Sequence, residues 1–119
     1  MATSQSSHAQ ITPKDFRVCI DNIGCSDSVL KISKAELLKA SRITPNFSWL
    51  TIKSLTIYVG EGNYTSEITT IIVKGDTINN EARKIFQRLA SGGLVTIEVE
   101  GYNKRNERIP WGSLSLRIL

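Results

Sequence analysis

The sequence predicts a mainly β, α+β domain, an antiparallel sandwich-like arrangement of roughly seven short strands with two helices. Short segments in which apolar and polar residues alternate run along most of the chain, separated by Gly, Asn, Asp and Pro. Helical patterns occur only twice, so strands and helices do not alternate regularly as in a parallel sheet. The chain has 119 residues, 40% of them hydrophobic. We therefore expect a single β-rich domain over residues 10–119.

The first half of this domain begins with two short strands and a helix. The predicted strands are residues 16–20 and 29–32. Ser33 and Glu36 then form a capping box, in which each side chain satisfies a free backbone N–H, and this predicts a helix over residues 34–41. Pro45 prevents the helix from continuing and favours an extended backbone before it.

The longest β pattern of the chain runs over residues 47–59. Its alternation changes phase near Lys53 and Ser54, which predicts a β-bulge that turns the second half of the strand toward a different face. The turn-forming residues 60–63 follow. They predict a hairpin whose return strand covers residues 64–73.

The second helix, over residues 78–91, has apolar residues at three- and four-residue spacing. Thr77 or Asn79 can cap its start, and Gly92 is expected to end it in a left-handed conformation. Two more alternating strands are predicted at residues 95–99 and 114–118, with a polar turn over 103–107 between them.

The first ten residues, MATSQSSHAQ, have the small residues that end a secretory signal peptide, with the junction before Gln10. We therefore expect residues 1–9 to be a tail and the domain to be periplasmic or otherwise exported. The alternative is an ordinary Ser-rich cytosolic N-terminus. No apolar run approaches the roughly eighteen residues that a membrane span needs, so no membrane span is expected in this chain.

Cys19 and Cys25 flank a segment of turn-forming residues, which could bring the two sulfur atoms together. Either a short-range disulfide or two free thiols would fit this spacing. A zinc site is not expected, because the one histidine, His8, lies in the tail and two cysteines cannot supply four ligands.

Three segments occur in an order that is found in a known family. They are the helix start Ile32–Leu38, the central strand Leu50–Ile57, and the glycine-ended helix that runs into a strand, Leu89–Glu98. Together with Arg108-Ile109-Pro110 before the last strand, they resemble the C-terminal domain of the gliding-motility protein GldM. That family belongs to the type IX secretion and gliding machinery of Bacteroidetes. The resemblance implies a β-rich periplasmic protein-interaction module without chemistry of its own.

The expected function is therefore non-enzymatic binding of a protein partner in the cell envelope, within a secretion, gliding or other envelope assembly; a homodimer is an open alternative. The residues expected to contact the partner are Trp49, Lys104, Arg105, Arg108 and Trp111. Both tryptophans could instead be core residues. The C-terminal strand, residues 113–119, is expected to offer an exposed edge for backbone pairing.

Two other binding functions compete with this one. Tyr58 and Tyr64 flank the predicted hairpin turn and could stack on a carbohydrate of the cell wall, or could simply form a cross-strand pair. A cytosolic nucleic-acid-binding domain would have to use the basic residues Lys104, Arg105 and Arg108. The net charge of +4 is modest and basic residues are interleaved with acidic ones, which argues against nucleic acid as a partner.

Catalysis and a cofactor are not expected. Glu98 and Glu100 lie two residues apart and share one face of a strand, and we interpret them as solvated charges. A Ser-His-Asp set would need a histidine within the folded part, and His8 lies in the tail.

Overall fold

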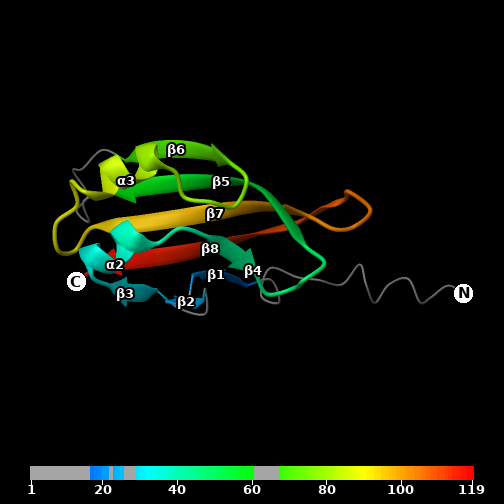
Figure 1. Ribbon diagram of the computed structural model, residues 1–119, viewed down its shortest axis with the longest axis horizontal. Coiled ribbons are helices and arrows are strands. Elements are labelled where there is room, and N and C mark those ends of the chain that lie inside the picture. The colour runs from blue at the N-terminus through cyan, green and yellow to red at the C-terminus, as the bar shows by residue number, and fades with distance from the viewer. Residues whose placement is uncertain (1–16, 22, 26–28, 61–67) are drawn as a thin grey trace, which may run out of the picture.

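The computed structural model describes residues 17–21, 23–25, 29–60 and 68–119, with the side chains of Pro110 and Trp111 excepted. Within these residues the chain forms two β-sheets and two helices (Figure 1). The mainly β, sandwich-like α+β fold predicted from the sequence is confirmed. The expected boundary at Gln10 and the tail before it lie outside the described residues.

The described part of the chain contains eight strands, one more than expected. In chain order the elements are β1 (Val18–Ile20), β2 (Gly24–Cys25), β3 (Leu30–Ile32), α2 (Lys34–Lys39), β4 (Ile43–Pro45), β5 (Thr51–Gly60), β6 (Thr69–Lys74), α3 (Asn80–Phe86), β7 (Leu94–Tyr102) and β8 (Arg108–Ile118). The larger sheet has five strands in the order β3-β8-β7-β5-β6, and the smaller sheet has three in the order β2-β1-β4. Neighbouring strands are antiparallel except for the parallel pair β3 and β8.

One face of the larger sheet is covered by α2, α3 and the smaller sheet, whose elements lie across its strands in Figure 1. The burial of β5 and β7 alternates from residue to residue, as expected for strands with one buried and one open face. The largest fully buried side chains are Phe86, Ile20, Leu37, Ile43, Leu55, Ile57, Ile78, Ile97, Leu114, Leu116, Val18 and Val95. No described helix or strand packs on the other face of the larger sheet, which we call the open face (Figure 1).

The helix α2 begins at the predicted residue, α3 begins two residues later than predicted, and both end earlier than predicted. Ser33 and Glu36 form the complete capping box at the start of α2. Asn79, not Thr77, caps α3 by accepting a hydrogen bond from the backbone of Ala82 at 2.9 Å. The helix α3 ends at Phe86, with Gln87 as its C-cap, and the amides of Arg88 and Leu89 then bind carbonyls only three residues back. Gly92, with φ of 88°, lies in the turn that leads to β7 rather than at the end of the helix.

The β-bulge predicted near Lys53 is confirmed by the shift in register between Ile52 and Ser54. The prediction that this bulge turns the second half of β5 toward a different face is wrong. Ile52 and Leu55 both lie in the one core, so the extra residue keeps the two halves of β5 on the same face. The phase change in the sequence and the bulge in the strand compensate each other.

The expectation that the C-terminal strand is an exposed edge is wrong. β8 lies inside the larger sheet, between β3 and β7. Leu116, Arg117 and Ile118 pair with β3 on one side, and β7 pairs with β8 on the other. Among the described strands, the edges of the larger sheet are instead β3 and β6.

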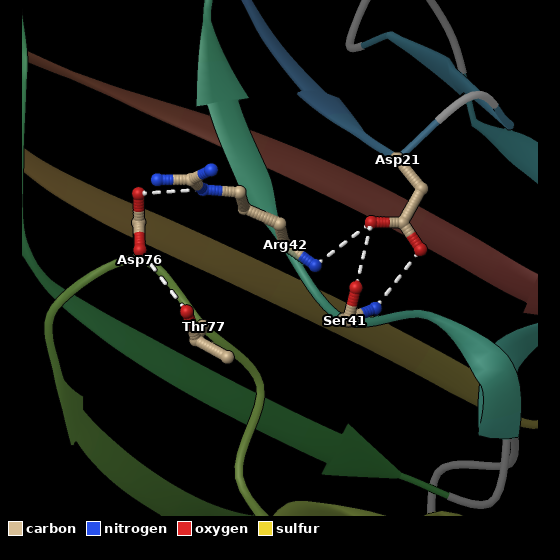
Figure 2. Close-up of polar contacts among 5 residues, drawn as sticks. All are labelled: Asp21, Ser41, Arg42, Asp76 and Thr77. Carbon is tan, nitrogen blue, oxygen red and sulfur yellow. Dashed lines mark hydrogen bonds and ion pairs between the residues drawn. The ribbon is translucent and has the colours of Figure 1, made fainter.

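A group of polar contacts connects the smaller sheet to the segments around it (Figure 2). The carboxylate of Asp21, directly after β1, accepts hydrogen bonds from the backbone amides of Ser41 and Arg42 at 2.9 and 2.8 Å. The Arg42 guanidinium in turn lies 3.1 Å from the carboxylate of Asp76. The chain after α2 is thereby held between the end of β1 and the segment that precedes α3.

Cys19 and Cys25 form a disulfide with an S–S distance of 2.05 Å. The two residues lie directly opposite each other in the antiparallel pair of β1 and β2. The sequence left open whether these cysteines are bonded, and the structure shows that they are.

Candidate functional site

The open face of the larger sheet contains a shallow hollow of about 350 Å³. It lies over β5, β7 and the start of β8. Its lining residues are Ser54, Thr56, Glu98, Val99, Glu100 and Arg108. The register of the sheet brings them together, because Ser54 lies opposite Glu100 and Thr56 lies opposite Glu98.

Glu100 is the most connected side chain of this hollow. One carboxylate oxygen accepts a hydrogen bond from the Ser54 hydroxyl at 3.0 Å, and the other accepts one from the Tyr102 hydroxyl at 2.7 Å. The Arg108 Nε lies 4.0 Å from that second oxygen. The Arg108 side chain remains 65% exposed, so its charge is available to a molecule that binds the open face.

The bulge in β5 adds Lys53 to this arrangement. Lys53 is the extra residue at the register shift, and its Nζ lies 4.6 Å from the centre of the Tyr102 ring. The same Nζ donates a hydrogen bond to the side chain of Asn106 at 2.9 Å. The bulge therefore connects the open face to the turn between β7 and β8.

Glu98 lies on the same side of β7 as Glu100. Its Oε1 accepts a hydrogen bond from the Tyr58 hydroxyl at 3.0 Å, across the β5–β7 pair. Its other oxygen has no hydrogen-bond partner among the described residues. The hollow thus presents an acceptor from Glu98 and a cation from Arg108. We call Lys53, Ser54, Tyr58, Glu98, Glu100, Tyr102 and Arg108 the open-face cluster.

The hydrogen bonds of this cluster shift the pKa values of three groups. The hydroxyls of Tyr102 and Ser54 lower the pKa of Glu100, and the positive charges of Arg108 and Lys53 act in the same direction. The hydrogen bond to Glu98 raises the pKa of Tyr58, and the hydrogen bond to Glu100 raises the pKa of Tyr102. At neutral pH Glu100 is therefore a charged acceptor, and both tyrosines keep their protons.

The residues that the sequence singled out do not gather in one place. Arg108 belongs to the open-face cluster, whereas Lys104 and Arg105 are exposed on the turn between β7 and β8. Trp49 is half-buried against the core, and its ring stacks on Phe47 with 5.1 Å between ring centres. The side chain of Trp111 lies outside the described part of the structure.

The carbohydrate hypothesis relied on tryptophan and tyrosine side chains, with Tyr58 and Tyr64 on either side of the predicted hairpin turn. Tyr58 lies opposite Thr70 in β6 and Thr96 in β7, and its hydroxyl binds Glu98. Tyr64 falls outside the described residues, as does His8.

Sequence reasoning missed three members of the cluster: Lys53, Ser54 and Tyr102. The alternation of β7 places Tyr102 on the same face as Glu100 and Glu98, and this signal is visible in the sequence. The positions of Lys53 and Ser54 depend on the register between β5 and β7, which the sequence alone does not supply.

The cluster offers hydrogen-bond acceptors, hydroxyl donors and two cations on a sheet face that no described helix or strand covers. Within the described ranges no group of three or more His, Cys, Asp or Glu side chains could hold a metal ion. The helices of that same part of the chain are too short or too polar to cross a membrane. Comparison with known proteins finds no matching family model, no matching curated protein and no matching solved structure.

Proposed function

We propose that this protein is a non-enzymatic interaction module that binds a protein partner on the open face of its larger sheet. The observation that carries the proposal is the hollow over β5, β7 and β8, in which a mostly exposed Arg108 lies beside the ionised Glu100. A flat, half-polar sheet face with a cation at its rim is suited to recognition of another protein surface, for which arginine and tyrosine are favoured residues.

The pKa directions within the cluster support binding over acid–base chemistry. A carboxyl group that acts as a general acid near neutral pH needs a raised pKa. The hydroxyls around Glu100 instead lower its pKa, and the carboxylates raise the pKa values of Tyr58 and Tyr102. These groups stabilise one another in fixed protonation states, which suits a recognition surface.

The proposal includes an exported location. The disulfide between Cys19 and Cys25 supports it, because such bonds persist in oxidising compartments such as the periplasm. A role in the cell envelope, in an assembly like that of the GldM family, rests on the resemblance of Ile32–Leu38, Leu50–Ile57 and Leu89–Glu98 to that family's C-terminal domain.

Affinity capture from a cell-envelope extract tests the proposal when variants of the open face are compared. Thr56→Arg places a large charged side chain in the hollow, and Arg108→Ala removes the exposed cation. Each is expected to reduce capture of a specific partner by about tenfold or more, the effect of losing about 1.4 kcal/mol of binding. Arg88→Ala, at an exposed arginine after α3, is the matched control and should capture as the wild type does.

Circular dichroism and urea unfolding of each variant show whether the fold is kept. Equal capture by the wild type and by folded Thr56→Arg would remove the open face as the binding surface.

Carbohydrate binding is the second candidate, and one observation favours it: hydroxyl and carboxylate groups line the hollow together. Such groups hydrogen-bond the hydroxyls of sugars. Calorimetric titration with soluble cell-wall glycans separates the two functions. Heat of glycan binding that the wild type shows and Glu98→Gln does not would favour the carbohydrate function.

A further inference from the structure

Among the described strands, β6 is an edge of the larger sheet, and its residues show few of the usual protections against pairing. Residues Thr69–Lys74 pair with β5 in an unbroken register, and the other side of β6 carries no strand in the described part of the structure. The strand contains no proline and no bulge, and its one charge, Lys74, stands at its end. Natural edge strands are usually protected by such features, so an unprotected edge indicates a strand that pairs with another chain.

The side chains of this edge that lie on the open face of the sheet are unusually apolar. Ile72 is 71% exposed and Ile68, directly before β6, is 67% exposed, the two highest values among large hydrophobic residues of the described chain. Ile68 continues the line of the strand, because a Cβ placed on Gly60 of β5 would lie 3.9 Å from its Cγ1. Thr70 lies between the two isoleucines and is exposed as well.

The order of these side chains is symmetric about Thr70. Residues 68, 70 and 72 share one face of the strand and read Ile, Thr, Ile in either direction. In an antiparallel pair of two identical strands centred on Thr70, Ile68 of each copy lies opposite Ile72 of the other, and the two Thr70 residues lie opposite each other. Apolar–apolar and Thr–Thr pairs are both favourable across neighbouring strands.

Charge also permits this pairing. In the register centred on Thr70, the two copies of Lys74 lie on opposite sides of the dimer axis, so they do not face each other. If the partner were a different protein, the side chains of β6 would not need to read the same in both directions. The symmetric pattern therefore indicates a second copy of this chain.

We propose that two copies of this protein form a homodimer by antiparallel pairing of their β6 edges about Thr70. The interface is isologous, with the same strand contributed by each copy. The two larger sheets become one continuous sheet, and the two open faces lie on the same side of it. The proposal rests on the edge strand alone and holds whatever binds the open face.

Cysteine cross-linking tests the register of this dimer. The two native cysteines are bonded to each other, so an introduced cysteine is the only free thiol of the chain. Directly opposite residues in an antiparallel pair have Cβ atoms about 4.5–5.5 Å apart, close enough for a disulfide after a small adjustment. Thr70→Cys is expected to form a covalent dimer under mild oxidation, faster than Ile72→Cys and much faster than Lys84→Cys, the exposed control on α3.

Sedimentation of the unmodified protein is the second measurement. It should show twice the monomer mass of 13.2 kDa. Ile72→Lys should sediment as a monomer with an unchanged circular dichroism spectrum, because a lysine on an edge strand opposes pairing and this one would lie opposite the apolar Ile68 of the other copy. A wild-type monomer at all concentrations, or a dimer that Ile72→Lys leaves intact, would overturn the proposal. Cross-linking that is strongest for Ile72→Cys would overturn the register about Thr70.

Discussion

Asp21 and Arg42 bind each other through their backbones and through the Asp21 side chain. The amide of Asp21 donates to the carbonyl of Arg42 at 2.9 Å, and Oδ1 of Asp21 accepts from the amide of Arg42 at 2.8 Å. The same carboxylate accepts from the amide of Ser41 (Figure 2). Asp21 holds these bonds with φ of 43°, a left-handed conformation that Asp and Asn tolerate better than most residues. The contact connects the smaller sheet to the chain that leaves α2.

Removal of this carboxylate should therefore weaken the fold. Asp21→Ala loses the acceptor of two backbone amides, and we expect it to lower the free energy of unfolding by about 1–3 kcal/mol. Asp21→Asn keeps one acceptor oxygen and tolerates the positive φ, so its loss should be smaller. Urea unfolding measures both values.

The control for this prediction is Asp76→Ala, which removes the ion pair with Arg42 and the hydrogen bond from the Thr77 hydroxyl but no bond to a backbone amide of residues 41 or 42. The Arg42 side chain is 64% exposed, and an ion pair of this kind contributes less than about 1 kcal/mol. If Asp76→Ala cost more than Asp21→Ala, the role assigned to Asp21 would be incorrect.

The disulfide is expected to make a modest contribution to stability. It closes a short segment, with six residues of sequence separation. The loop-entropy relation gives about 2 kcal/mol for such a segment. A variant with Cys19→Ser and Cys25→Ser should therefore fold with a lower unfolding midpoint in urea. Wild-type protein under reducing conditions is the control and should match the variant; an unchanged midpoint in both would contradict the estimate.

The lowered pKa of Glu100 predicts the direction of the acid dependence of stability. The charged form is favoured in the folded state relative to its ordinary pKa of 4.5. Its contribution is therefore present above that value and is lost as the pH falls through the lowered folded value. Tyr102→Phe removes the largest cause and should raise the pKa of Glu100 in an NMR titration of its carboxyl carbon. A pKa that moves down in this variant would contradict the assignment.

The raised pKa values of Tyr58 and Tyr102 predict how the stability of the fold changes at alkaline pH. The pKa values of Tyr58 and Tyr102 are raised above 10.0, so their contribution is fully present below that pH and is lost as the pH rises through the folded values. Glu98→Gln should lower the pKa of Tyr58 and leave that of Tyr102 in place. Ultraviolet absorbance of the tyrosinates, recorded for this variant and for Glu100→Gln, distinguishes the two groups.

The C-terminal strand is expected to be essential for folding because it lies inside the larger sheet. Ile118 is 4% exposed, and its backbone bonds Gly92 and Gly93 at 2.8 and 2.9 Å. Ile118→Ala should cost about 2–5 kcal/mol, the range for large-to-small changes in a core. The neighbouring Arg117 is exposed, so Arg117→Ala should stay within about 0.5 kcal/mol of the wild type. Thermal unfolding compares them, and equal midpoints would contradict the place of β8.

The parts of the fold that were predicted from the sequence depend on local signals. The capping box of Ser33 and Glu36 involves residues three positions apart, and the bulge near Lys53 appears as a change of phase within one strand. Such features can be read along the chain because the interacting residues are neighbours in it.

The errors come from contacts between distant segments. The alternation of residues 113–119 identifies a half-buried strand, but it does not say which strands lie on either side. The parallel pairing of Leu30 with Leu116 places β8 inside the sheet, and no local pattern encodes this pair. The open-face cluster has the same origin, since Ser54 and Glu100 are 46 positions apart in the sequence.

The role of the open face is tested most directly by a photoreactive side chain placed on each side of the sheet. Benzoylphenylalanine at Thr56 lies in the hollow, and at Lys84 it lies on α3, which covers the other face. After irradiation in an envelope extract, mass spectrometry identifies the cross-linked proteins. We predict one specific partner linked from position 56 and none from position 84. A specific partner linked from position 84 and none from position 56 would contradict binding at the open face.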